Sequence, residues 1–127
     1  MIDDDFPDYL PDCPPLPHVC PEGVYFRILK SENGPNESDF KSNHERNQLS
    51  RGSDECENRA ISIWNNQESI RALKANWRNA TKRGIIEVVI NSNAGVIHPR
   101  EHRLPGHCIW WVSAKVSPLS MCRNRVG

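Results

Sequence analysis

The sequence predicts a single α+β domain with a mixed, mostly antiparallel sheet and about two helices. Apolar stretches with strand character alternate with segments of turn or helix character, and shorter strands follow. This order is too irregular for a doubly wound parallel sheet, and neither common glycine-rich nucleotide loop is present. A chain of 127 residues fits one domain, because smaller pieces would bury too little apolar surface.

The two ends of the chain differ in composition from its centre. Residues 1–21 hold most of the ten prolines and begin with an acidic run, so we expect an arm that is extended or disordered. Residues 118–127 follow the last apolar stretch and are expected to form a tail. The α+β domain is therefore predicted to span residues 22–117.

The first strand is predicted over residues 24–30, where aromatic and aliphatic side chains dominate. The segment SENGPNES that follows is rich in turn-forming residues and ends the extended run. Asn36 or Ser38 is expected to cap a short helix there. Because Phe40 is its one apolar anchor, this helix should lie on the surface with a single contact inward.

The second strand is predicted over residues 59–64, and the clearest helix of the chain follows it. Asn65 is the predicted N-cap, and Glu68 three residues later completes a capping box. Gly84 marks the expected end of this helical segment. An apolar stripe at helical spacing predicts its buried face, which consists of Ile70, Leu73 and Trp77.

Three further strands complete the predicted sheet. Residues 85–90, IIEVVI, are apolar enough for a central strand. Residues 96–99 are expected to form a short strand, and residues 108–116 the last one. A polar loop, PREHRLPG, separates these two strands because its prolines interrupt regular structure.

Charge and composition exclude several classes of partner. Sixteen basic and sixteen acidic side chains give a formal net charge of +0, whereas proteins that coat nucleic acid or anionic membranes need a basic excess. The basic residues of the predicted helix are therefore interpreted as its solvated face. No apolar run is long enough to cross a bilayer. We expect no membrane association and no nucleic-acid partner.

The cysteines and the start of the chain bear on its compartment. Five cysteines at irregular spacing do not suggest a disulfide framework. The acidic start lacks the basic-then-apolar order of a secretory signal. We therefore expect a cytoplasmic chain with reduced thiols. Closely spaced pairs of metal ligands are missing, so no metal is expected.

Arg27 raises the main functional question, because it lies inside an otherwise apolar predicted strand. Alternate residues share a face of a strand, so Arg27 and Tyr25 point the same way. A buried guanidinium needs a compensating partner. One explanation is a ligand phosphate or carboxylate that the forked head binds through two hydrogen bonds. The other is a solvent-exposed edge position or an internal carboxylate, with Glu57, Glu87 and Glu101 as candidates.

Other predicted strands offer candidate ligand contacts. Ser62 faces away from its apolar neighbours and should bond either a ligand or local backbone. His107 precedes the last strand, and Trp110 and Trp111 follow it. Because adjacent strand residues face opposite ways, one tryptophan is expected in the core and the other at a surface or cleft.

Blocks of the sequence resemble a known family. VYFRILKSE, DFKSNHERN, CENRAISIWNNQESIRALK, AGVIHP and HCIWW look like successive blocks of a family of small, functionally uncharacterised bacterial proteins. The resemblance covers about residues 22–112 and implies a stand-alone bacterial domain without a stated activity.

A more remote resemblance concerns the order of three residue types. An arginine on the first strand, followed by a strand with a serine that leads into a helix, is similar to ADP-ribosyltransferase-like folds. This resemblance implies that Arg27 holds the phosphates of NAD and that the Ser62 strand supports the nicotinamide pocket. Glu101 is the nearest candidate for the catalytic glutamate, although the paired-glutamate motif of those folds is missing.

Two classes of function remain open. The first is a domain with an anion- or nucleotide-accepting cleft, in its most specific form an NAD-using ADP-ribosyltransferase-like toxin or effector. In it Arg27 would hold a phosphate, Ser62 would orient the ligand, and His107 with a tryptophan would form the pocket wall. The alternative is a non-catalytic protein-interaction module, such as an antitoxin, immunity or phage-defence accessory protein. The sequence does not decide whether the protein is an enzyme.

Overall fold

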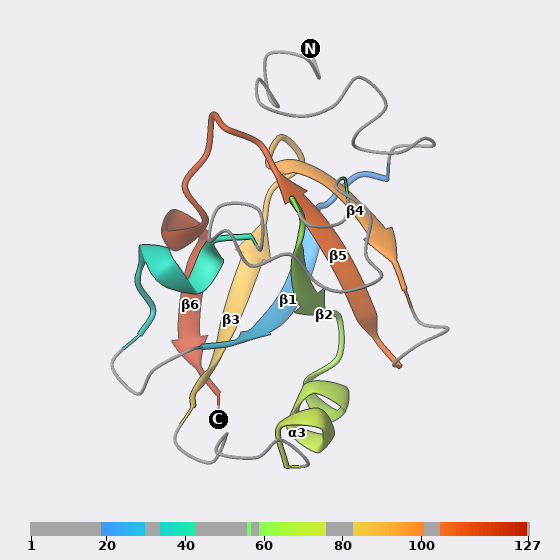
Figure 1. Ribbon diagram of the computed structural model, residues 1–127, viewed down its shortest axis with the longest axis vertical. Helices are drawn as coiled ribbons and strands as arrows, with labels where there is room; N and C mark the ends of the chain where they lie inside the picture. The colour runs from blue at the N-terminus through green and yellow to red at the C-terminus, as the bar shows by residue number, and fades with distance from the viewer. Residues whose placement is uncertain are drawn as a thin grey trace.

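The computed structural model describes residues 19–29, 34–42, 56, 59–75, 83–100 and 105–126. These residues form one six-stranded sheet in the order β4-β5-β2-β1-β3-β6 (Figure 1). Every neighbouring pair of strands is antiparallel. The described part of the chain has one α-helix, α3 (Gln67–Ala75), and two 3-10 helices, η1 (Glu37–Phe40) and η2 (Pro118–Met121). The predicted α+β class is confirmed, whereas the predicted mixed sheet is antiparallel between all its described strands.

All five predicted strands are present. β5 ends earlier than expected, because the chain turns at Ser113, whose carbonyl accepts a bond from the Val116 N–H at 3.2 Å. β6 was not predicted as a strand. The strands are β1 (Gly23–Ile28), β2 (Ile61–Trp64), β3 (Ile85–Ile90), β4 (Gly95–Pro99), β5 (His107–Val112) and β6 (Cys122–Arg125).

Residues 118–126 belong to the domain, so the predicted boundary at residue 117 is wrong. β6 pairs with β3 through Ile86↔Arg125 and Val88↔Cys122, with an irregular register between these pairs. The sequence CRNR gave no strand signal because three of its four residues are exposed at the edge of the sheet. At the opposite edge, β4 receives an isolated bridge from Val19. Residues 1–18 of the predicted arm lie outside the described residues.

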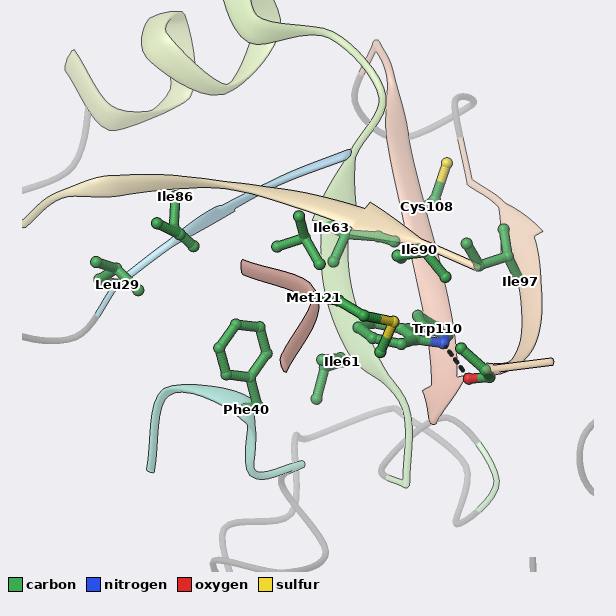
Figure 2. Close-up of a cluster of buried hydrophobic side chains, with 12 residues drawn as sticks. Leu29, Phe40, Ile61, Ile63, Ile86, Ile90, Ile97, Cys108, Trp110 and Met121 are labelled. Atoms are coloured by element: carbon green, nitrogen blue, oxygen red, sulfur yellow. Dashed lines mark hydrogen bonds between the residues drawn. The ribbon is translucent and has the colours of Figure 1, made fainter. Parts of the chain in front are cut away.

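One face of the sheet, here called the η face, is covered by η1 and η2. A cluster of buried hydrophobic side chains fills the space between this face and the two 3-10 helices. Figure 2 shows Phe40 pointing from η1 into this cluster, which also contains Met121 of η2. Trp110 lies at the centre, and its indole N–H donates to the Ala94 carbonyl at 2.9 Å. This bond satisfies the polar atom of a fully buried ring, so the tryptophan can occupy the core.

The opposite face, here called the α3 face, is covered by α3 over part of its width. Ile70 of α3 is fully buried against strand residues. The Asn66 side chain accepts a bond from the Ser69 N–H at 3.0 Å, so the helix is capped one residue later than predicted. Asn65 instead donates its backbone N–H to Gly106 at 2.9 Å. The expected continuation of the helix beyond residue 75, including Trp77, lies outside the described residues.

The cysteines occur in two states. Cys56 is disulfide-bonded, whereas Cys20, Cys108 and Cys122 are free thiols. The prediction that all thiols are reduced is therefore wrong for Cys56. Disulfides are rare in reducing compartments, so this bond gives no support to the cytoplasmic expectation. Among the described helices, none combines the length and apolar character that a membrane crossing requires.

Cys122 should give the protein a measurable alkaline sensitivity. Burial, and next to it the charge of Asp39, raises the pKa of the Cys122 thiol from 9.0 to about 11. A raised pKa favours the protonated thiol in the folded state, so its contribution to stability is complete below pH 9 and is lost as the pH rises towards 11. We expect the variant Cys122→Ala to lose this component of the unfolding free energy, measured by urea denaturation across that range.

A second readout of the same property is alkylation. At about pH 8, iodoacetamide should modify the exposed Cys20 well before Cys122, because the thiolate is the reacting form. Mass spectrometry of the two peptides gives the rates. Equal rates at both positions would contradict a raised Cys122 pKa.

Candidate ligand-binding site

The Arg27 guanidinium is bonded to the protein's own backbone. Its Nε donates to the Asp39 carbonyl and its Nη1 to the Ser62 carbonyl, each at 2.6 Å. The guanidinium carbon also lies 5.7 Å from the centre of the Phe40 ring, a cation–π contact. Arg27 therefore connects η1 to β2, and we call this arrangement the Arg27 bridge.

The register of the sheet explains why an arginine is needed there. β1 and β2 pair at Phe26↔Trp64. Residues two apart on a strand direct their backbone groups to the same side, so the Ser62 carbonyl faces β1 just beyond that pair. The Arg27 side chain donates to it at this point. This carbonyl is partly buried, so the loss of its donor would cost at most about 1–3 kcal/mol, the value for a buried group.

The acceptors of Arg27 differ from those expected. An internal partner was one of the two explanations, with glutamates as candidates, whereas these two nitrogens bond backbone carbonyls. Glu87 pairs with Phe26 and therefore lies on the face opposite Arg27. Glu57 and Glu101 lie outside the described residues.

The η1 side of the bridge is held by its own capping box. The Asp39 carboxylate accepts a bond from the Asn36 N–H at 2.9 Å, and the Asn36 side chain accepts one from the Ser38 N–H at 3.0 Å. Asp39 is fully buried. The choice between Asn36 and Ser38 as the cap is thereby decided for Asn36. These bonds fix the Asp39 carbonyl where Arg27 reaches it.

The seven predicted site residues do not meet in one place. Strand register puts three of them on the η face and three on the α3 face, and Glu101 lies outside the described residues. The layer of the sheet therefore separates the Arg27 guanidinium from the Ser62 hydroxyl. The η-face residues are Tyr25, Arg27 and Trp110, and the α3-face residues are Ser62, His107 and Trp111.

Both tryptophans belong to cores. As predicted, they face opposite ways, with Trp110 in the η-face cluster and Trp111 in an α3-face cluster. Each is fully buried, so the expectation that one lines a surface is not met. The Trp111 indole N–H donates to the Cys56 carbonyl at 2.9 Å.

Tyr25 packs beside the η-face core and keeps a protonated hydroxyl. Burial is the main cause that raises the pKa of Tyr25 above its usual 10.0, and Cys108 and Cys20 add to the rise. A neutral phenol can donate a hydrogen bond but cannot act as a base at neutral pH. Tyr25 lies on the same face of β1 as Arg27, which is the face opposite Ser62 and His107.

Ser62 and His107 form a polar pair on the α3 face. The Ser62 hydroxyl lies 3.0 Å from Nε2 of His107. The His107 ring also packs on the Trp64 ring, with centroids 5.0 Å apart and planes tilted by 35°. Their neighbours along each strand, such as Ile63 and Cys108, are buried, whereas Ser62 and His107 are each partly exposed. Solvent thus reaches this face at its polar pair.

The turn before His107 brings the start of α3 close to the pair. Gly106 has φ 75°, a left-handed conformation that favours glycine. A Cβ at Gly106 would lie 3.0 Å from the Asn65 side-chain oxygen, so a larger residue would have to displace that side chain. The glycine therefore permits the close approach that positions His107.

Arg100 lies next to His107 at the end of the neighbouring strand. Its backbone N–H donates to the His107 carbonyl at 2.8 Å, which continues the β4–β5 ladder by one pair. By strand alternation Arg100 shares the α3 face with His98, whose ring meets Trp111 edge-on at 5.5 Å. Arg100 was not among the site residues predicted from the sequence. Its two-residue spacing from His98 was the available signal.

A comparison of the chain with protein families, curated proteins and solved structures finds no match. The functional interpretation therefore depends on the chemistry of the α3 face. A hydroxyl and an imidazole 3.0 Å apart can both donate hydrogen bonds to one anionic group.

Proposed function

We propose that the protein binds an anionic, nucleotide-like small molecule on the α3 face at the Ser62–His107 pair. The observation that carries the proposal is the 3.0 Å contact between two partly exposed polar side chains within a mostly apolar sheet face. Ligand sites typically combine apolar walls with a few converging polar groups.

Each side chain has a distinct role in this proposal. When Nε2 of His107 donates to the Ser62 oxygen, the serine proton is available for a ligand oxygen. Arg100, whose backbone pairs with His107 and whose guanidinium donates to the Pro99 carbonyl at 3.1 Å, adds a positive charge to the neighbouring strand end. The buried Trp64 ring packs on the His107 ring and thereby holds the imidazole in place beside Ser62.

NAD or one of its fragments is the ligand class that the remote resemblance suggests. Of the three residues in that resemblance, Ser62 belongs to the proposed site, Arg27 lies on the other face, and Glu101 is outside the described residues. We therefore propose binding, and extend the proposal to ADP-ribosyl transfer only if turnover of NAD is measured.

Calorimetric titration with ADP-ribose, NAD and pyrophosphate tests this function. At least one of them should bind the wild-type protein, and Ser62→Ala should weaken its affinity by about tenfold or more, since a hydrogen bond to a charged group contributes about 1.5–3 kcal/mol. Ser120→Ala is the matched control, because Ser120 is exposed and its hydroxyl bonds only the nearby Ser117 carbonyl.

Two results would overturn the proposal. One is the failure of all three compounds to bind, which would favour the non-catalytic interaction module. The other is equal affinity in Ser62→Ala and Ser120→Ala. Release of nicotinamide from labelled NAD would extend the proposal to an enzyme.

A further inference from the structure

The Ser62–His107 pair has the arrangement of a nucleophile with its base. The Ser62 hydroxyl lies 3.0 Å from Nε2 of His107, which is within the reach that general-base catalysis requires. In the register of β2 and β5, Ser62 pairs with Ile109 and His107 with Trp64, so the contact is a diagonal one between adjacent strands. Side chains on paired strands are held more precisely than side chains on loops.

The imidazole of His107 is held in its orientation by its surroundings. The buried Trp64 ring packs on it with centroids 5.0 Å apart. The turn before His107 is fixed by the left-handed conformation of Gly106 and by the bond from the Asn65 N–H to the Gly106 carbonyl. A nucleophile and base whose base is oriented by further groups form the usual arrangement for covalent catalysis.

We infer that Ser62 is a nucleophile that His107 activates, and that the pair transfers the acyl group of a small activated ester. A carbonyl carbon is an electrophile that a hydroxyl with an adjacent imidazole attacks in many enzymes. Both residues are partly exposed, so a small ester can reach the hydroxyl. The inference goes beyond the proposed binding, because it assigns a reaction to the same pair, and it does not require the anionic ligand.

The reaction has two steps. In the neutral tautomer with its proton on Nδ1, Nε2 of His107 accepts the Ser62 proton while Oγ forms a bond to the carbonyl carbon of the ester. The bond from this carbon to the leaving oxygen breaks with its electron pair, and the imidazolium gives its proton to that oxygen. In the second step water loses a proton to Nε2 and attacks the acyl-serine, Oγ leaves and regains the proton, and a carboxylic acid is released.

Incubation of the wild-type protein with p-nitrophenyl acetate tests the nucleophile. Acid quenching at successive times, followed by peptide mapping, locates the acetyl groups. Ser62 should be acetylated about 100-fold or more faster than Ser120, since general-base catalysis contributes about 10²–10⁴-fold. Ser120 is the matched control, because it is exposed and its hydroxyl donates to the Ser117 carbonyl at 2.7 Å. Mapping is needed because the exposed Cys20 thiol also reacts with this ester.

Two variants separate the base from the nucleophile. His107→Gln should slow the acetylation of Ser62 by about 100-fold or more, because glutamine keeps a polar group beside the hydroxyl but cannot take up its proton. Ser62→Ala should lose the corresponding release of nitrophenolate, whereas Ser120→Ala should retain it. Circular dichroism shows whether each variant is folded, and the wild-type mapping decides the inference where a variant is not.

Two results would overturn the inference. One is a wild-type protein with neither acetylated Ser62 nor a release of nitrophenolate that depends on Ser62. The other is an equal rate of Ser62 acetylation in the wild type and in folded His107→Gln. Binding of ADP-ribose without acetylation would refute the nucleophile alone, and acetylation without any binding of the three anionic compounds would refute the proposed ligand alone.

Discussion

Replacing Arg27 with methionine is expected to lower the free energy of unfolding by about 3 kcal/mol. The substitution keeps the aliphatic stem but removes both donors of the Arg27 bridge, which leaves the Asp39 and Ser62 carbonyls without these bonds. Each hydrogen bond to a charged group contributes about 1.5–3 kcal/mol, and the partial exposure of Arg27 reduces the sum. Urea denaturation followed by circular dichroism measures the loss.

Two further variants make this test specific. Arg27→Lys should lower the free energy of unfolding by about 2 kcal/mol. Lysine keeps the charge but lacks the forked guanidinium that donates to both carbonyls. Arg123→Met is the control and should cost less than about 0.5 kcal/mol. Arg123 is exposed, and within the described part of the chain it bonds only the nearby Ser120 and Cys122 carbonyls. Equal losses at the two arginines would refute a bridging role for Arg27.

Replacing Gly95 with alanine is expected to lower the free energy of unfolding by about 4 kcal/mol. Gly95 has φ 116°, a conformation that L side chains rarely adopt. A Cβ there would lie 2.0 Å from the Trp111 carbonyl oxygen and 2.9 Å from the Ser113 nitrogen. Both are backbone atoms of β5 or its end, so the β4–β5 pairing itself would have to move.

Gly84→Ala is the matched control for this prediction. A Cβ at Gly84 would meet the Arg125 guanidinium, which is the far end of a flexible side chain and can be displaced. We expect a loss of less than about 1 kcal/mol for this variant under the same denaturation protocol. A Gly95→Ala protein as stable as Gly84→Ala would contradict the close approach of β4 and β5.

The hydrophobic pattern of the sequence predicted the strands whose side chains are mostly buried. Four of the six residues of β3 are buried because the strand lies between β1 and β6, and the apolar run IIEVVI reflects this. β6 was missed because it lies at the edge and exposes most of its side chains, which leaves no hydrophobic pattern. Local patterns thus identified the interior strands and not the edge.

Which of the predicted site residues share a face of the sheet depends on the pairing register of the strands, and local sequence patterns do not give this register. Alternation correctly placed Tyr25 with Arg27, and it separated Ser62 from Ile61 and Ile63. Which face of β2 matches which face of β1 depends on the Phe26↔Trp64 register, and a shift of one residue would reverse it. The site predicted from Arg27 and Ser62 together assumed a shared face that this register does not give.

The partners of Arg27 and the burial of Trp111 were also beyond local patterns. The acceptors of Arg27 are carbonyls 12 and 35 residues away in the sequence, and any residue type could supply them. The Trp111 indole N–H donates to the carbonyl of Cys56, 55 residues away. Backbone contacts between distant segments leave no side-chain signature, so only the three-dimensional structure reveals them.

The affinity of ADP-ribose for two variants tests most directly the claim that ligand binding belongs to the α3 face and Arg27 to the scaffold. Calorimetry on folded protein should give Arg27→Lys an affinity within about twofold of wild type, since its side chain lies on the other face of the sheet. Ser62→Ala should bind ADP-ribose at least about tenfold more weakly than the wild type. The reverse order, with binding lost in Arg27→Lys and kept in Ser62→Ala, would contradict the account.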